Sequence, residues 1–318
     1  MRIYSSTEYC EKLKIRPVNI GSLNNKPPVL RVVHKYFPKD YDELKEIIKE
    51  RIQNEGNNCN LNDIDVSKIS DFSLLFLNSE FNGDISMWDV TNATNMEAMF
   101  KSSEFNGDIS DWNVGNVVNM CSMFSLSKFE GDISKWNVSK VVNMKGMFSG
   151  SAFLSGDNFV DISSWDTSSV VCMEDMFYCC NVIPDISKWD VSNVKNMKGM
   201  FRCTNRFRCS LNGWDVSNVE NMNSMFEISK FNGNISNWNT LSLKNMNSMF
   251  HDAENFNCDI SGWTVSNVKQ IDYAFCCAYS FQQDLSSLYF PNIKHEPNYV
   301  FYNCPIEHDI AKQPKYNC

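Results

Sequence analysis

The sequence predicts an α/β repeat solenoid, in which short coils of chain stack along one axis. Its eight tryptophans are successively 24, 24, 29, 24, 25, 24 and 25 residues apart, and a phenylalanine follows each of them twelve residues later. Fourteen of the 16 methionines occupy two further slots of the same unit. A fixed period of about 20 to 50 residues is typical of a solenoid, a propeller or an array. About 24 residues are too few for a propeller blade or a helical hairpin, so the period favours single coils.

Each coil is expected to hold one short strand and one short return segment. In the first full copy, the apolar residues of Ile85–Val90 stand at positions 1, 4 and 6, which is the spacing of the strand in a leucine-rich repeat. Alternation along a strand then points Trp88 inward and Asp89 outward. The two methionines and the phenylalanine that follow have the i, i+3, i+4 spacing of a helix, so they predict about one turn of α- or 3₁₀-helix on the opposite wall.

The repeated tryptophans are interpreted as a buried core ladder, with a cofactor site as the alternative. Stacked coils bring identical residues to about 4.8 Å from one another, the spacing of paired strands. Methionine fills the gaps that rigid rings leave in such a core. A column of asparagines before the first methionine of each copy is expected to bond the turn backbone. The ladder consists of Trp88, Trp112, Trp136, Trp165, Trp189, Trp214, Trp238 and Trp263.

Composition limits the classes of function. The chain has 318 residues, of which 43% are hydrophobic and 21% charged, and its formal net charge is −9. The acidic balance and the lack of a Lys/Arg cluster argue against a nucleic-acid-binding surface. No apolar run reaches the roughly 18 residues of a membrane span, and the first residues lack the apolar segment of a secretory signal. We therefore expect no nucleic acid partner, no membrane insertion and no conventional export.

The chain divides into four predicted segments. The first lacks the repeat and contains several prolines, so an irregular arm is expected there. A capping helix follows it, then about ten coils of 24–25 residues whose first and last copies are degenerate, as terminal repeats usually are. A tail is expected to fold over the open end. The segments are 1–36 (irregular arm), 37–58 (capping helix), 59–303 (repeat solenoid) and 304–318 (C-terminal tail or cap).

The capping helix has a recognisable start and end. Asp40 and Glu43 form a capping box, and Gly56 ends the helix. One face is apolar, so the helix is expected to cover the first coil, with a membrane-surface or partner-binding helix as the alternative. The apolar face consists of Leu44, Ile47, Ile48 and Ile52.

The 13 cysteines allow three interpretations. A disulfide framework and a zinc cluster are two of them, but the chain has no CxxC pair and its cysteines scatter over variable slots. This pattern favours reduced thiols that act as small apolar side chains. Cys179 and Cys203 both lie two residues after their repeat phenylalanine, so they should stack on adjacent coils within reach of a disulfide bridge. No histidine is expected near a cysteine or serine through the repeat register, and we predict no metal site and no cofactor.

The slot after each tryptophan is the candidate partner-binding face. It points outward and carries mainly Asp and Asn, and a purely solvated face is the alternative interpretation. An insert of five residues makes one long turn within 149–160, which is a second candidate contact region. We predict no catalytic residues, because the chain has no phosphate-binding glycine loop, GxSxG or HExxH, and a carboxylate that recurs in one slot is architectural. The candidate face consists of Asp89, Asn113, Asn137, Asp166, Asp190, Asp215 and Asn239.

The unit FNGDISMWDVTNATNMEAMF resembles the repeat of the BspA-like leucine-rich repeat family, usually written FNxDISxWDVSNVTNMxxMF, over about residues 60–301. The resemblance implies a right-handed leucine-rich-repeat-like solenoid. It also implies surface proteins assigned to adhesion and host interaction in bacteria and some protists, and similar repeats occur in proteins of large DNA viruses. Unlike the surface members of that family, this sequence is expected to have no export signal, no lipid-attachment cysteine and no membrane tail. The resemblance therefore favours an intracellular or virion-associated location.

Three functions are compatible with this sequence. The first expectation is a non-enzymatic protein-interaction or adhesion-type repeat protein that presents a solenoid face to an unknown protein partner, a host protein included. The second is a structural or virion-associated repeat protein, and a hydrolase is the third. The protein is expected to be a monomer or to self-associate weakly.

Overall fold

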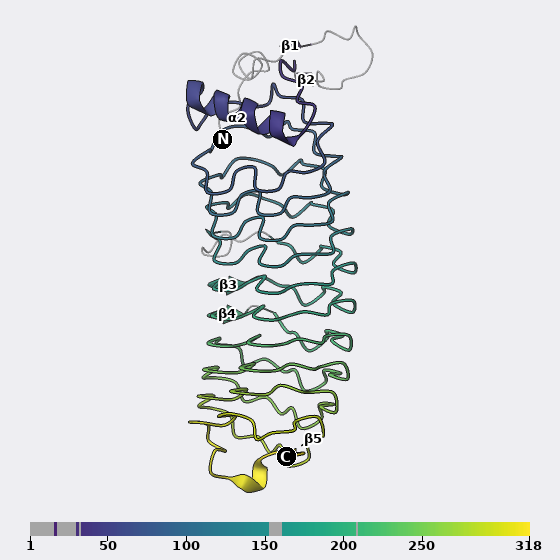
Figure 1. Cartoon of the computed structure of the whole chain (residues 1–318), viewed down its shortest axis with the longest axis vertical. Helices are drawn as coiled ribbons and strands as arrows, with labels where there is room; N and C mark the ends of the chain where they lie inside the picture. The colour runs from purple at the N-terminus through teal and green to yellow at the C-terminus, as the bar shows by residue number, and fades with distance from the viewer. Residues whose placement is uncertain (1–15, 18–29, 32, 153–160, 208) are drawn as a thin grey trace.

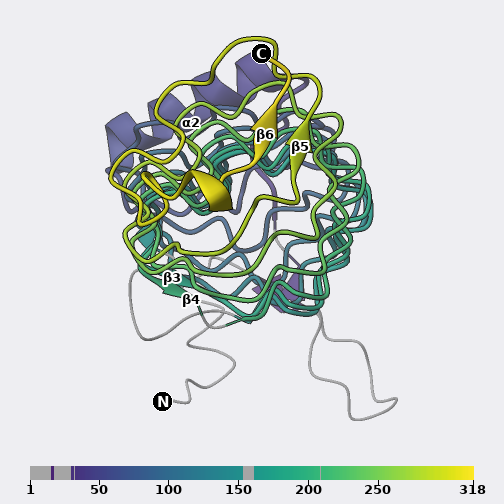
Figure 2. The same cartoon turned by 90° about the horizontal axis from the view of Figure 1, so that it is seen from below.

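In the computed structural model, successive copies of the repeat stack as coils along one long axis (Figure 1). Seen along this axis, the coils follow a common outline (Figure 2). The structure describes residues 16–17, 30–31, 33–152, 161–207 and 209–318. Most of the irregular arm predicted over 1–36 and part of the long turn predicted over 149–160 therefore lie outside the described residues.

Regular secondary structure is sparse in the part of the chain that the structure describes. The strands pair two by two: β1 is antiparallel to β2, β3 is parallel to β4, and β5 of the last coil is parallel to β6 of the C-terminal tail. The elements are β1 (Arg16–Pro17), β2 (Leu30–Arg31), α2 (Tyr41–Glu55), β3 (Val182–Ile183), β4 (Arg206–Phe207), β5 (Tyr289–Phe290), η2 (Ile310–Lys312) and β6 (Lys315–Tyr316).

Backbone bridges between equivalent residues join the coils. Asn95 forms a parallel bridge with Asn119, and such bridges continue from coil to coil as far as Gln270. The expected asparagine ladder is confirmed. The side-chain oxygen of Asn95 accepts the N–H of Glu97 at 3.1 Å, and it also accepts a bond from the Asn119 amide at 3.1 Å. Each asparagine of the column caps its own turn through its side-chain oxygen, and the amide of Asn119 also bonds the neighbouring coil.

The prediction of a strand over Ile85–Val90 is wrong. The structure has a tight turn there, closed by a 3.1 Å bond from the N–H of Trp88 to the carbonyl of Ile85, and an equivalent bond closes the turn at every tryptophan. The preceding aspartate explains the turn. The Oδ1 atom of Asp84 accepts the N–H of Ser86 at 3.0 Å, and this side-chain bond turns the chain locally.

The return segment is not helical either. The N–H of Met99 does bond the carbonyl of Met96 at 3.3 Å, but the N–H of Ala98 donates to Cys121 of the next coil at 2.7 Å. Ala98 and Ser102 have φ values of 50° and 53°, and left-handed backbone recurs at these two slots in coil after coil of the described chain. Left-handed residues four positions apart interrupt the helical path, and every second N–H, from Met96 to Ser102, bonds the next coil instead. The assignment to right-handed leucine-rich-repeat-like solenoids stays a prediction.

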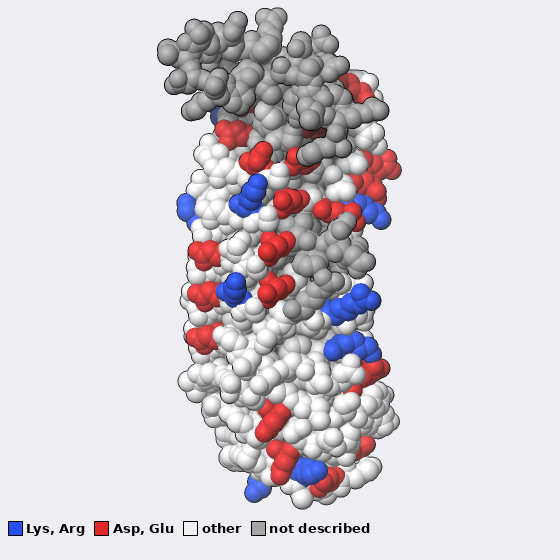
Figure 3. Space-filling view, turned by 180° about the vertical axis from the view of Figure 1, so that it is seen from behind, with Lys and Arg blue, Asp and Glu red and all other residues white. Residues whose placement is uncertain are grey.

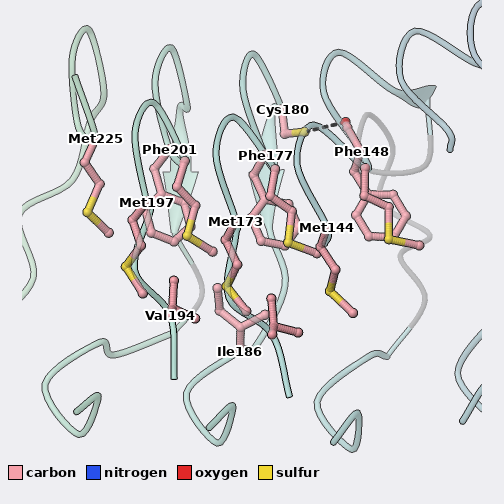
Figure 4. Close-up of a cluster of buried hydrophobic side chains, with 14 of the residues drawn as sticks. Met144, Phe148, Met173, Phe177, Cys180, Ile186, Val194, Met197, Phe201 and Met225 are labelled. Atoms are coloured by element: carbon pink, nitrogen blue, oxygen red, sulfur yellow. Dashed lines mark hydrogen bonds between the residues drawn. The ribbon is translucent and has the colours of Figure 1, made fainter. Parts of the chain in front are cut away.

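The repeated aromatic and methionine side chains fill the inside of the coils. All eight tryptophans are only 2–4% exposed. Figure 4 shows the methionines of neighbouring coils in rows beside stacked phenylalanines. The rings of Trp88 and Trp112 lie 6.3 Å apart at 5°, and those of Phe76 and Phe100 lie 5.6 Å apart at 2°. Both ring-centre distances exceed the value of about 4.8 Å that was expected from the spacing of paired strands.

Each indole N–H bonds to the preceding coil. The Nε1 atom of Trp189 donates to the carbonyl of Ile162 at 3.0 Å, and all eight tryptophans make the equivalent bond at 2.9–3.3 Å. The ring is therefore buried without an unpaired donor, as a large aromatic side chain with a polar atom requires. The tryptophan both fills its own coil and bonds its neighbour.

Helix α2 lies across the end of the stack at which the chain enters (Figure 1). The side chain of Asp40 caps the helix by accepting the backbone N–H of Glu43 at 3.0 Å. Leu44 and Ile48 are buried in the same hydrophobic core as the coils. Arg51 places Nη1 at 2.7 Å from Oδ1 of Asp63, so an ion pair ties the helix to the first coil.

Two substitutions of Trp189, and one of the residue before it as a control, test the indole slot. Trp189→Ala should lower the free energy of unfolding by about 3–5 kcal/mol, because it leaves a cavity. Trp189→Phe should lower it by about 1–3 kcal/mol, because the carbonyl of Ile162 loses its donor. The exposed neighbour provides the control: Lys188→Ala should stay within about 0.5 kcal/mol of the unmodified protein. Urea denaturation followed by tryptophan fluorescence measures all three, and equal effects of Trp189→Ala and Lys188→Ala would contradict a packed ladder.

Candidate functional site

The candidate face is an exposed column along the stack. Each side chain in it accepts the backbone N–H two residues later, as Asp166 does from Ser168 at 3.1 Å and Asp215 does from Ser217 at 3.0 Å. The same bond occurs at the other five positions of the column. The structure therefore gives these residues a turn-capping role in addition to their exposure. In the view of Figure 3, acidic side chains lie one above another along the long axis.

Hydrogen bonds favour the ionised state of two carboxylates of this column, Asp166 and Asp215. The hydroxyl and then the backbone N–H of Ser168 lower the pKa of Asp166, and Ser217 lowers the pKa of Asp215 in the same way. Donors favour the charged form of a carboxyl group. The column thus combines fixed negative charge with side chains that the backbone holds in place.

A second row of functional groups follows the repeat phenylalanine. We call it the edge row, and it consists of Tyr178, Arg202, Glu227, His251 and Cys276, each one residue after that phenylalanine on five successive coils. The guanidinium carbon of Arg202 lies 5.6 Å from the ring centre of Tyr178, and Nη2 of Arg202 lies 3.0 Å from Oε1 of Glu227. The same Glu227 oxygen lies 3.6 Å from Nδ1 of His251. Repeat register alone therefore brings unlike residues into contact.

Two adjacent thiols lie at the end of the edge row. The Sγ atoms of Cys276 and Cys277 are 3.8 Å apart, and together with a ring nitrogen of His251 they form a group whose atoms all lie within 4.8 Å of one another. Burial raises the pKa of Cys276 to about 12, and the neighbouring Cys277 adds to the shift. The Nε2 atom of His251 lies 3.4 Å from a carboxylate oxygen of Asp252.

The expectation that no histidine lies near a cysteine is wrong at this point. His251 and Cys276 each directly follow their repeat phenylalanine, so the stacking of coils places one above the other. The register of the repeat already indicates this contact. It is found only when the residues in one slot are compared between neighbouring copies, even where their types differ. The prediction of no metal site therefore overlooked the one group of three such side chains found among the described residues.

Cys179 and Cys203, the thiols that were predicted to stack, lie in the equivalent slot of adjacent coils, two residues after the repeat phenylalanine. Burial, followed by the neighbouring Cys179, raises the pKa of Cys203 to about 11. Both residues have left-handed backbone, with φ values of 54° and 59°. The cysteines in the described part of the chain are free thiols.

The fold and these two rows define a repeat protein built of stacked coils. The chain belongs to the family described as "Mycoplasma protein of unknown function, DUF285", which matches residues 43–158, 151–230 and 211–312. These matches cover the capping helix and nearly all of the coils, in agreement with a BspA-like repeat family. No curated protein and no solved structure matches the chain. Within the described ranges, none of the helices has the length and apolar character needed to cross a membrane.

Acid should destabilise the stack by protonating the aspartates whose side chains cap the turns. Their pKa values in the folded state are lower than the value of about 3.9 in the unfolded chain. Their contribution to stability is therefore present above about pH 4 and is lost as the pH falls through the lowered folded values. The affected residues are Asp132, Asp161, Asp166, Asp185, Asp215 and Asp284.

The double variant Asp166→Asn/Asp215→Asn separates charge from turn capping. Asparagine already occupies this slot at Asn113, Asn137 and Asn239, where it accepts the same backbone bond. The variant should fold normally at neutral pH and lose less stability on acidification than the unmodified protein. Thermal unfolding followed by circular dichroism between about pH 7 and about pH 3 measures the difference, and superimposable pH profiles would refute the assignment.

Proposed function

We propose that the protein is a non-enzymatic repeat protein that binds a protein partner through the exposed column. One observation carries this proposal: the inward slots of the repeat are buried and nearly constant, whereas the outward column is exposed and varies in charge. Its central three coils carry Asp166, Asp190 and Asp215, so that negative charge repeats once per coil. A scaffold with a fixed interior and a variable exterior is typical of repeat proteins that display a binding surface.

The partner that fits this column is a basic protein segment. Each carboxylate uses one oxygen to cap its own turn, and an ionised carboxylate has further acceptor positions for lysine or arginine side chains. The spacing is set by the stack, so an extended or helical basic segment that runs along the axis could contact several coils at once. Such charge complementarity mainly determines selectivity and the rate of association.

A structural role through end-to-end association is the second candidate. Exposed apolar side chains at the C-terminal end of the stack favour it, since Tyr299, Tyr302 and Ile310 are 59%, 47% and 80% exposed. A hydrolase is the third candidate, and a screen of nucleotides and glycans for cleavage would reveal it.

Charge reversal of the column tests the first candidate. A partner captured from the native cell and purified should bind Asp166→Lys/Asp190→Lys/Asp215→Lys at least about tenfold more weakly, because attraction becomes repulsion. The corresponding triple Asn variant keeps the turn-capping bonds and should give a smaller loss. Titration calorimetry or surface plasmon resonance measures the three affinities.

A charge-matched control tests whether net charge alone explains the effect. Glu104, Glu130 and Glu296 are exposed and lie in other repeat slots, so their triple Lys variant changes the net charge equally. It should bind the partner with nearly unchanged affinity. Intact capture by the column variant, or an equal loss in the control, would remove the column as the binding face.

A further inference from the structure

We propose that His251, Cys276 and Cys277 bind a single zinc ion through two thiolates and one imidazole. The distance between the two sulfur atoms carries the first step. Zinc binds cysteine sulfur at about 2.3 Å in tetrahedral geometry, which requires about 3.8 Å between two ligating sulfurs. The Sγ atoms of Cys276 and Cys277 are 3.8 Å apart, and a nitrogen of His251 lies within 4.8 Å of both.

The backbone holds this arrangement from both sides. Cys277 has a φ of 58°, and this left-handed conformation allows two successive side chains to lie close together, whereas in a strand they would point to opposite faces. The N–H of Cys277 donates to the carbonyl of Tyr302 at 2.7 Å, and the N–H of Asp252 donates to the carbonyl of Cys276 at 2.9 Å. The neighbouring coils therefore fix the ligands, so little conformational freedom is lost when the ion binds.

Carboxylates surround the histidine as they do in known types of zinc site. Glu227, which is only 8% exposed, lies 3.6 Å from Nδ1 of His251, and Asp252 lies 3.4 Å from Nε2. Whichever ring nitrogen binds the ion, the other one has a carboxylate oxygen within 3.6 Å. A carboxylate that bonds the free ring nitrogen orients the ring and makes it a stronger ligand. Thiolate and imidazole donors select zinc over magnesium or calcium, and three protein ligands leave one coordination position for water or a fourth group.

A second pair of adjacent cysteines in this chain shows what the proposed site requires. Cys179 and Cys180 are also consecutive, but the Sγ atom of Cys180 turns inward and donates to the carbonyl of Phe148 at 3.1 Å (Figure 4). These thiols do not form a group of three with a histidine among the described residues. Adjacent cysteines alone are therefore insufficient, and Cys179 with Cys203 provides a matched control of two thiols.

Titration of the reduced, chelator-treated full-length protein with Co²⁺ tests the proposal, because Co²⁺ reports thiolate ligation by its absorption and is displaced by Zn²⁺. We expect one equivalent to produce thiolate-to-cobalt charge transfer and tetrahedral d–d bands, both removed by Zn²⁺. Cys277→Ser and His251→Asn should each weaken binding more than a change of a supporting residue does. Glu227→Gln and Asp252→Asn are compared, and the one that removes the carboxylate facing the non-ligating ring nitrogen should weaken binding by roughly 10–100-fold.

The double variant Cys179→Ser/Cys203→Ser should leave the Co²⁺ titration unchanged. Cys277 is only partly buried, so Cys277→Ser should fold, and circular dichroism verifies this for each variant. Absence of charge-transfer absorption in the unmodified protein would overturn the proposal. It would equally be overturned if Cys277→Ser bound Co²⁺ as the unmodified protein does, or if the control variant lost the signal instead.

Discussion

Hydrogen bonds between equivalent backbone groups of neighbouring coils are the constraint on which the rest of the structure depends. The N–H of Met96 bonds the carbonyl of Asn119 at 2.9 Å, and the same bond recurs between later coils. A buried backbone group needs a partner, and here the partner belongs to the next copy of the unit. Every coil must therefore present its donors and acceptors at the same places, and this requirement accounts for the nearly constant period.

The repeated side chains follow from the same constraint. The indole of Trp189 and the amide of Asn119 each bond an adjacent coil, so they stabilise the contact between units as well as the unit itself. Left-handed backbone at residues such as Ala98 and Ser102 costs about 1–2 kcal/mol per residue without glycine. The bonds along the stack offset this cost, because they form only when every second N–H points toward the neighbour.

Much of the fold could be predicted because burial and period are properties of the sequence. The ladder of indoles, the methionine slots and the cap of α2 at Asp40 all follow from residue type and spacing. The turns could not be predicted from apolar spacing, because Ile85–Val90 fits a strand equally well and only its Asp–x–Ser pattern indicates a side-chain cap. The left-handed backbone of the return segments could not be predicted either, because few of these positions carry the glycine that usually indicates it. The candidate site was only partly predictable, because the contact between His251 and Cys276 joins unlike residues on separate copies.

The two functional rows differ in how they use repetition. The outward column repeats one turn-capping side chain, whereas the edge row places a different residue on each coil from Tyr178 to Cys276. Equivalent residues of neighbouring coils lie next to one another. A new side chain in one copy is therefore placed directly beside the corresponding side chain of the next copy. Duplication of a unit that carries a thiol would at once create a contacting pair, as Cys179 and Cys203 illustrate in the slot beside the edge row. New chemistry can thus arise in this architecture by copying a segment and changing a single residue, with no change of fold.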